Sequence, residues 1–215
     1  RLTEIPNRHM DEILKYFPDL TPKQIEQLTK LGTLYPEWNQ KINVISRKDI
    51  DNLYTHHILH SLSIGKFITP VAGTKFLDLG TGGGFPGIPL AILWPDCSFH
   101  LIDRIGKKIK VAQSIAEEVG LTNVSFQHGD SGECHNKFDF VISRAVMQLD
   151  ELVKLIQRNI SPKSVNKLPN GLICLKGGDL RAELGREKHP LIDVPLSDYF
   201  PHEYFAEKDL IYVEL

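Results

Sequence analysis

Two kinds of hydrophobic pattern divide the chain. Over roughly the first 70 residues, apolar side chains recur every three to four positions, which is typical of amphipathic helices. From about residue 75 onward, short apolar runs bounded by polar or glycine-rich turns alternate with helical stretches, which predicts strands alternating with helices. We therefore expect a helical subdomain over residues 1–70 and an α/β domain over residues 71–215.

The helical part contains two predicted helices. The first begins at Thr21, where Thr-Pro-Lys-Gln forms a capping box with proline at the first helical position, and apolar residues follow at helical spacing. The second covers about residues 50–67, after a polar connector at residues 38–43. Pro70 to Gly73 provide a break before the first strand.

Apolar runs in the second part predict a seven-stranded sheet. Strands that alternate with helices pair in parallel through right-handed crossovers, and the last two runs predict a hairpin at one edge. The fold class is therefore α/β and Rossmann-like, with a mostly parallel sheet. The predicted strands cover residues 75–79, 97–103, 124–128, 138–142, 171–175, 191–194 and 210–213.

A glycine-rich turn follows the first strand, where residues 78–87 read DLGTGGGFPG. Glycine is needed where the backbone takes a positive φ and approaches a ligand without a Cβ atom in the way. An acid two residues before the first of three alternating glycines is typical of class I methyltransferases, which use S-adenosylmethionine. The cofactor-binding positions predicted in this turn are Asp78, Gly80, Gly82 and Gly84.

The same turn also admits a dinucleotide pattern. Gly82, Gly84 and Gly87 have the G-x-G-x-x-G spacing of NAD-binding folds, so a NAD-dependent dehydrogenase is an alternative. A dinucleotide turn should begin directly at the end of the strand, however, and Gly80 occupies that place. The register that starts at Asp78 is therefore preferred.

Polar side chains follow the other predicted strands. Asp103 ends the second strand, close to the spacing expected of a carboxylate that binds ribose hydroxyls. Asp130 follows the third strand, on the side where an adenine would lie. Arg144 and Lys176 end the fourth and fifth strands and deliver two cations to the same crevice.

Three histidines raise the possibility of a metal site. His56 and His60 have the i, i+4 spacing of a helical zinc pair. His57, however, stands where the H-E-x-x-H motif has its glutamate, and no third ligand is evident. We expect no metal, and no motif connects these histidines with the crevice.

Composition limits the location and the partners of the protein. The chain has 215 residues, a net charge of −2, and three separated cysteines that imply neither a disulfide framework nor a zinc site. No apolar run is long enough to span a bilayer. We expect a monomer in the reducing cytoplasm, with RNA contact limited to a local basic run. This run consists of Arg104, Lys107, Lys108 and Lys110.

The turn, the Ser-Arg-Ala sequence at residues 143–145 and the Leu-Lys-Gly sequence at 175–177 resemble the glucose-inhibited division protein B family. Members methylate N7 of a guanine in 16S ribosomal RNA of the bacterial small subunit. The resemblance covers nearly the whole chain, although His60 and Ser131-Gly132 differ from the common family residues. It implies S-adenosylmethionine as cofactor and adds contacts to it from residues matching Gly80, Phe85, Ser131, Gly132 and Arg144.

This activity implies a simple chemical mechanism. Guanine N7 has a free lone pair and loses no proton before it attacks the methyl group, so no general base and no catalytic residue of that kind are expected. Arg144 and Lys176 are predicted to position the cofactor carboxylate or a phosphate. A ribosome-assembly factor that keeps the fold but transfers no methyl group is a further alternative.

Overall fold

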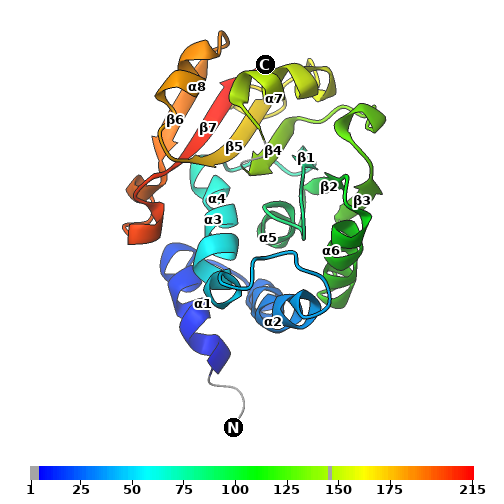
Figure 1. Cartoon of the computed structure of the whole chain (residues 1–215), viewed down its shortest axis with the longest axis vertical. Helices are drawn as coiled ribbons and strands as arrows, with labels where there is room; N and C mark the ends of the chain where they lie inside the picture. The colour runs from blue at the N-terminus through cyan, green and yellow to red at the C-terminus, as the bar shows by residue number, and fades with distance from the viewer. Residues whose placement is uncertain (1–4, 145–146) are drawn as a thin grey trace.

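A single seven-stranded sheet organises the fold. The computed structural model describes residues 5–144 and 147–215. The strand order is β3-β2-β1-β4-β5-β7-β6 (Figure 1). The strands are β1 (Lys75–Leu79), β2 (Ser98–Asp103), β3 (Val124–His128), β4 (Phe140–Arg144), β5 (Gly171–Gly177), β6 (Leu191–Pro195) and β7 (Lys208–Glu214). Neighbours from β3 to β5 are parallel and β7 is antiparallel to both β5 and β6, which confirms the predicted fold class and its edge hairpin.

Helices cover both faces of the sheet. In Figure 1, α7 and α8 lie at the top of the view, and α1, α2, α5 and α6 lie on the other side of the strands. Side chains alternate accordingly along β1, where Phe76 belongs to the apolar core under α5 and Leu77 to the core under α7. These helices are α1 (Ile5–Tyr16), α2 (Pro22–Asn39), α5 (Gly87–Leu93), α6 (Gly106–Glu118), α7 (Leu149–Ile156) and α8 (Arg181–Arg186).

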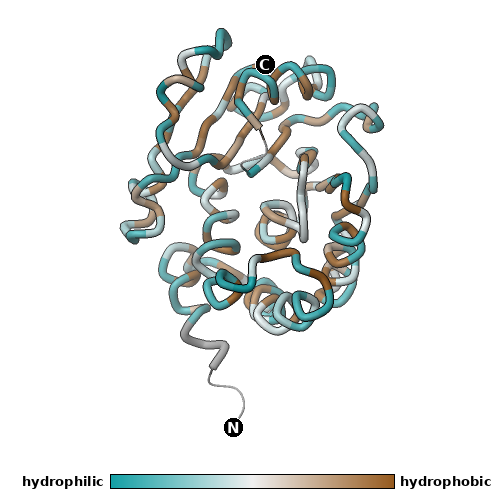
Figure 2. Tube along the Cα trace, in the orientation of Figure 1, coloured by the Kyte–Doolittle hydropathy of each residue, from teal (hydrophilic) through white to brown (hydrophobic). Residues whose placement is uncertain are grey.

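The strand predictions are confirmed with small shifts at the ends. The strand predicted to begin at Phe138 begins at Phe140, because Phe138 makes only an isolated bridge to Ile160. Hydrophobic residues concentrate in the strands and in the helices that pack on them (Figure 2). The capping box at Thr21 is also present, since Gln24 N donates to Thr21 Oγ1 at 3.2 Å and Thr21 N donates to Gln24 Oε1 at 2.8 Å.

The prediction of a single helix over residues 50–67 is wrong. The segment consists of a 3-10 turn η1 (Ile50–Asn52), a π-helix η2 (Leu53–Leu59) and two short α-helices, α3 (His60–Leu62) and α4 (Ile64–Phe67). Two buried residues of the π-helix, Leu53 and Ile58, are five positions apart, which matches the i→i+5 hydrogen bonding of a π-helix. π-Helical turns are frequent at functional sites, and this one carries His56 and His57.

The N-terminal helices share one apolar core with the sheet. Tyr35 of α2 is fully buried, its ring lies 4.7 Å from that of Phe85, and its hydroxyl donates to Gly83 O at 2.7 Å. Leu28 and Leu31 of the same helix join Ile88 of α5 in the same cluster. The helical part therefore packs directly against the glycine-rich turn and supports it from one side.

Candidate functional site

A cavity of about 600 Å³ lies at the carboxyl ends of β1, β2 and β3. Its volume is within the range of small-molecule sites, and its position at this edge is where α/β sheets bind their ligands. Five predicted cofactor positions contribute to its wall: Gly80, Asp103, Asp130, Ser131 and Gly132. The other lining residues are Leu79, Ile102, Arg104, Ile105, Gly129, Met147 and Leu155.

Asp103 fixes the shape of the cavity floor. Its Oδ2 accepts a hydrogen bond from Gly82 N at 2.8 Å, and its Oδ1 accepts one from Ile105 N at 2.9 Å. Gly82 has a φ of 60°, so this amide can face the carboxylate only because the turn adopts a left-handed conformation. One carboxylate thus joins the glycine-rich turn to the start of α6, and each oxygen keeps a further lone pair for a ligand.

Asp78 lies behind the turn and does not line the cavity. It is fully buried, and its Oδ2 accepts hydrogen bonds from Thr81 Oγ1 at 2.7 Å and from Gly87 N at 2.8 Å. Burial raises the pKa of this carboxyl group to about 7. The structure therefore corrects the expectation of direct cofactor contact, because Asp78 shapes the turn from beneath.

Gly84 also faces away from the cavity. Its φ is 116°, and a Cβ atom at this position would lie 2.4 Å from Ile88 Cδ1 and 3.0 Å from the Tyr35 hydroxyl. This glycine is required for packing between the turn, α5 and α2. The predicted cofactor contact at Gly84 is therefore not supported by its placement.

The loop after β3 forms the opposite wall of the cavity. Its 3-10 turn, η3 (Ser131–Glu133), is capped by Asp130, whose side chain accepts a hydrogen bond from Gly132 N at 2.8 Å. Arg158 donates to Ser131 O at 3.0 Å and holds the turn from outside. The backbone of this turn is therefore fixed at the place where the sequence predicts adenine recognition.

Arg144 ends β4 beside the glycine-rich turn but is not among the residues that line the cavity. Its guanidinium carbon lies 5.4 Å from the centre of the Phe85 ring. Its Nη1 donates to His57 Nδ1 at 3.0 Å and to His56 O at 3.3 Å. The third residue of the Ser-Arg-Ala sequence, Ala145, lies outside the described residues.

His56 and His57 thus contact Arg144, although no sequence motif connects them with this strand end. His57 lies between Arg144 and Asp49, and its Nε2 is 2.6 Å from Asp49 Oδ2. His56 Nδ1 lies 2.5 Å from Asp49 Oδ1, and its ring stacks on Tyr204 at a centroid distance of 3.7 Å. Sequence reasoning missed Asp49 and Tyr204, because they come from a connector and from the segment before β7, and neither carries a motif.

Burial and the neighbouring cation keep His57 neutral. Burial lowers the pKa of His57, the charge of Arg144 lowers it further, and Asp49 offsets only part of this, so that the pKa is about 4. Partial burial by itself would raise the pKa of Asp49, but hydrogen bonds from His56 and His57 reverse the effect and hold it below its usual range. The cluster therefore combines an ionised carboxylate, a neutral imidazole and a guanidinium.

Lys176 does not line this cavity but a neighbouring one of about 440 Å³, with which the cavity shares Met147. Its side chain is buried, and its Nζ lies 2.6 Å from Glu183 Oε2 and donates to Met147 O at 2.7 Å. Glu183 Oε2 also accepts a hydrogen bond from Leu149 N at 2.8 Å, at the first turn of α7. Lys176 therefore links β5, α7 and α8 in a buried ion pair, and its predicted positioning role stays a prediction.

The predicted basic run begins at the cavity wall and continues into α6. Arg104, Lys107 and Lys110 are exposed, and Lys108 is half-buried. Arg104 itself lines the cavity, and the lysines belong to the first turns of α6. Within residues 5–144 and 147–215, none of these four cations forms an ion pair. They are therefore available to an anionic partner beside the cavity mouth.

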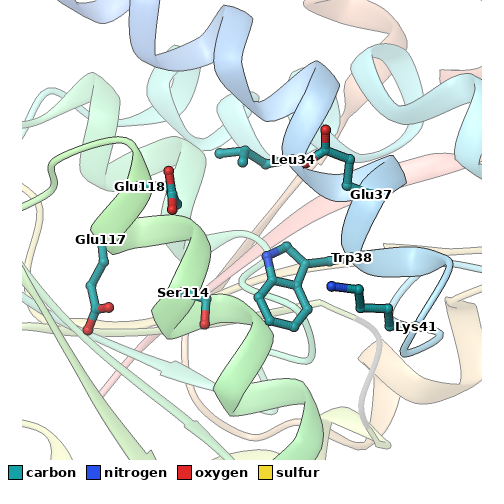
Figure 3. A pocket seen from close by; sticks show the side chains of 7 residues that line it. All are labelled: Leu34, Glu37, Trp38, Lys41, Ser114, Glu117 and Glu118. Carbon is teal, nitrogen blue, oxygen red and sulfur yellow. The ribbon is translucent and has the colours of Figure 1, made fainter.

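A second groove of about 570 Å³ lies between α2 and α6 (Figure 3). Three glutamates contribute to it, and its only cation, Lys41, lies 5.4 Å from the Trp38 ring centre. It contains none of the predicted site residues. Its lining residues are Leu34, Glu37, Trp38, Lys41, Ser114, Glu117 and Glu118. Chemistry and position both favour the cavity at the carboxyl edge of the sheet as the functional site.

Within residues 5–144 and 147–215, no group of three or more histidine, cysteine, aspartate or glutamate residues is placed to hold a metal ion. In the same residues, no helix has the length and apolarity that a membrane span requires.

Comparison with known proteins decides the family. The profile of the GidB family, described as rRNA small subunit methyltransferase G, matches residues 24–192. A protein of Bacteroides thetaiotaomicron named ribosomal RNA small subunit methyltransferase G is 57% identical over 206 residues, covering 96% of this chain and 100% of that protein. The chain belongs to this family. A protein of the same name from Porphyromonas gingivalis is 50% identical over 221 residues and covers 100% of both chains.

Family membership confirms the resemblance seen in the sequence and the predicted enzyme class, an S-adenosylmethionine-dependent methyltransferase. It also decides against the dinucleotide register and a NAD-dependent dehydrogenase.

Solved structures agree on the fold. A SAM-dependent methyltransferase from Aquifex aeolicus has a TM-score of 0.55 at 16% identity and covers 79% of this chain and 98% of its own. An RNA methyltransferase from Salinibacter ruber, in complex with S-adenosyl-L-homocysteine, has a TM-score of 0.50 at 17% identity, with coverage of 73% and 88%.

His60 gives rise to a prediction about acid stability. Its ring is buried, and within the described residues neither ring nitrogen has a hydrogen-bond partner. Burial lowers the pKa of His60 well below its ordinary value, and the charges of Arg144 and Lys208 lower it further. Below about pH 6.5 the unfolded chain binds a proton here that the folded protein does not, so folding stability falls as the pH decreases.

Replacing His60 by Leu should remove this contribution to the pH dependence of folding stability. Between pH 6.5 and pH 5, urea unfolding should show a wild-type stability that falls more steeply than that of the variant, by up to about 1.4 kcal/mol per pH unit. Asp78 and His57 also titrate differently in the folded and unfolded states, but both are present in both proteins and their effects cancel. Equal slopes would show that His60 binds a proton in the folded state.

The Lys176–Glu183 pair gives rise to a prediction about stability at neutral pH. Replacing Lys176 by Met leaves a buried carboxylate without its cation and should destabilise the fold by about 3–5 kcal/mol in urea unfolding. Combining it with Glu183→Gln should recover much of this loss, because a neutral amide still accepts the hydrogen bond from Leu149 N. As a matched control, Arg181→Met removes the exposed ion pair with Asp179 and should leave stability unchanged. Wild-type stability in Lys176→Met would contradict a stabilising role for the buried Lys176–Glu183 ion pair.

Proposed function

We propose that this protein transfers a methyl group from S-adenosylmethionine to N7 of a guanine in 16S ribosomal RNA. The observation that carries this proposal is the cavity at the carboxyl edge of the sheet, bounded by Gly80, Asp103 and the turn at residues 130–132, in a chain of the rRNA small subunit methyltransferase G family. The relatives' names supply the class of substrate, and the chemistry of the site supports the acceptor atom.

The proposed cofactor site uses the two walls of the cavity. Asp103 accepts the ribose hydroxyls, since both of its oxygens keep free lone pairs. Asp130, Ser131 and Gly132 receive the adenine, mainly through the fixed backbone of their turn. The glycine-rich turn from Gly80 to Phe85 approaches the methionine part, and Arg144 binds its carboxylate.

The chemical step needs no proton transfer. The N7 lone pair forms a bond to the methyl carbon, the carbon–sulfur bond breaks, and its electron pair remains on sulfur as a neutral thioether. The protein holds the two reactants in line, which is the main source of rate enhancement. The side chains near the turn suit this role, because Arg144 is a permanent cation and the Nδ1 lone pair of His57 already accepts a hydrogen bond from it.

The RNA side of the site is formed by two parts of the chain. Arg104, Lys107, Lys108 and Lys110 contact phosphates beside the cavity mouth, where they increase local affinity without making the whole protein basic. Residues 1–70 act as a helical subdomain that supports the turn and borders the acceptor site, and residues 71–215 bind the cofactor. We infer that the substrate is the small ribosomal subunit or its precursor, and that the protein works as a monomer in the cytoplasm.

Transfer of labelled methyl groups from S-adenosylmethionine to unmodified small subunits tests the function directly. Asp103→Ala should weaken binding of S-adenosylhomocysteine in calorimetry by at least about tenfold, because the ribose loses a charged acceptor. Asp51→Ala removes an exposed carboxylate that does not line the cavity and should bind like the wild type. Binding of the cofactor product without any methyl transfer to small subunits would favour a non-catalytic assembly factor.

A reaction that needs no general base gives rise to a prediction about the pH dependence of its rate. Single-turnover rates at saturating cofactor and RNA should stay nearly flat from about pH 6 to pH 8.5, because N7 attack releases no proton. His57 does not titrate in this range, since its pKa is about 4. Asp78 has a pKa of about 7, but it lies behind the turn and does not line the cavity, so its titration acts on cofactor binding and not on the chemical step. Saturation has to be verified at each pH so that RNA binding does not contribute. A steep rise with an apparent pKa of about 6.5, the ordinary value of histidine, would contradict N7 as the acceptor.

A further inference from the structure

The end of β4 carries a hydrogen-bonded chain of three side chains that the proposed mechanism does not assign. Arg144 Nη1 lies 3.0 Å from His57 Nδ1, and His57 Nε2 lies 2.6 Å from Asp49 Oδ2. Asp49 comes just before η1, His57 from the π-helix, and Arg144 from the sheet. Two segments eight residues apart and a strand end 87 residues farther along the chain thus meet at one imidazole ring.

The partners of His57 determine where its proton is. A guanidinium can only donate hydrogen bonds, so Nδ1 of His57 must offer its lone pair to Arg144. The ring proton is therefore on Nε2, where it is donated to the carboxylate of Asp49. The two neighbours select the same tautomer, which makes the arrangement self-consistent.

The ring also stays neutral, as this arrangement requires. A protonated imidazole has no lone pair to accept from Arg144 and would repel it. The charged and titratable groups around His57 are Arg144, Asp49 and His56, and together with burial they place its pKa at about 4. At neutral pH the acceptor is therefore always present.

These contacts restrict one side of the Arg144 guanidinium. Its Nη1 donates to His57 Nδ1 and to His56 O, and its guanidinium carbon lies 5.4 Å from the centre of the Phe85 ring. In the described part of the chain, Nε and Nη2 of Arg144 have no hydrogen-bond partner. One edge of the guanidinium is therefore held by the protein, and the remaining donors are left for an anionic group such as a carboxylate.

We propose that His57, oriented by Asp49, is a positioning residue that holds Arg144 against Phe85 in the geometry that binds the cofactor carboxylate. This inference rests on the proposed function, because it assumes that Arg144 binds the cofactor. The π-helix contributes the His56 carbonyl and the His57 ring to the same nitrogen. Without this support the long arginine side chain would have to be ordered at the moment of binding, at a cost in affinity.

Two amide substitutions distinguish the hydrogen bond at Nδ1 of His57 from the one at Nε2. In Asn, the amide oxygen is as far from Cβ as Nδ1 is in His, so His57→Asn keeps an acceptor for Arg144. In Gln, the amide is one carbon farther out, near the place of Nε2, so His57→Gln keeps a partner for Asp49 and loses the acceptor for Arg144. Both variants remove the ring and are equally polar, and equal thermal midpoints verify that both fold.

Calorimetry with S-adenosylhomocysteine should distinguish the variants. His57→Gln and Arg144→Ala should each bind at least about tenfold more weakly than the wild type, and His57→Asn should lose less than about threefold. In methyl transfer, the loss should be mainly in KM for the cofactor, with kcat changing less, because the contact exists before the transition state. The double variant His57→Gln/Arg144→Ala should be no weaker than Arg144→Ala, because His57 acts through Arg144.

Several results would overturn the proposal. These are wild-type affinity in His57→Gln or in Arg144→Ala, additive losses in the double variant, or a ¹⁵N spectrum at pH 7 with the His57 proton on Nδ1. The calorimetric comparison uses no RNA, so it stays separate from the proposed function. If the wild-type protein binds the cofactor but methylates no small subunits, the proposed function fails, while the comparison of His57→Gln with His57→Asn still decides the role of His57.

Discussion

A single buried carboxylate underlies the functional edge of the sheet. Asp78 accepts hydrogen bonds from Thr81 Oγ1 and Gly87 N, so that the glycine-rich turn is closed from beneath before any ligand is present. From this closed turn, Gly82 directs its amide to Asp103, which in turn fixes the start of α6. The cavity walls and the place of Phe85 both depend on this arrangement, since removing the acceptor would leave buried donors unsatisfied.

The sequence predicted the sheet well because its signals are local. Short apolar runs ended by glycine or polar residues define the strands, and the alternation with helices defines the parallel order, including the edge hairpin formed by β6 and β7. The irregular segment at residues 50–67 was predicted less well. A π-helix and an α-helix of that length have similar apolar spacing, and packing against the turn decides between them.

The site was only partly predictable, for a physical reason. Residues at strand ends, such as Asp103 and Arg144, reach the carboxyl edge by topology alone, so their positions follow from strand order. The positions of the residues that contact them do not follow from strand order. Lys176 also ends a strand, but α8 brings Glu183 to it and buries its charge. Asp49 and Tyr204 reach the cluster through loops whose paths depend on tertiary packing.

The position of β7 has a consequence for the order in which the protein can be completed during its synthesis. β7 is the last strand of the chain, but it lies between β5 and β6 in the sheet. Until β7 has been synthesised and has left the ribosome, β5 has an open edge of unpaired backbone groups and β6 has no neighbour. The nascent chain therefore exposes an apolar strand edge from the time β5 emerges until β7 pairs with it. A protein with this topology depends on rapid insertion of β7 to avoid pairing with another chain.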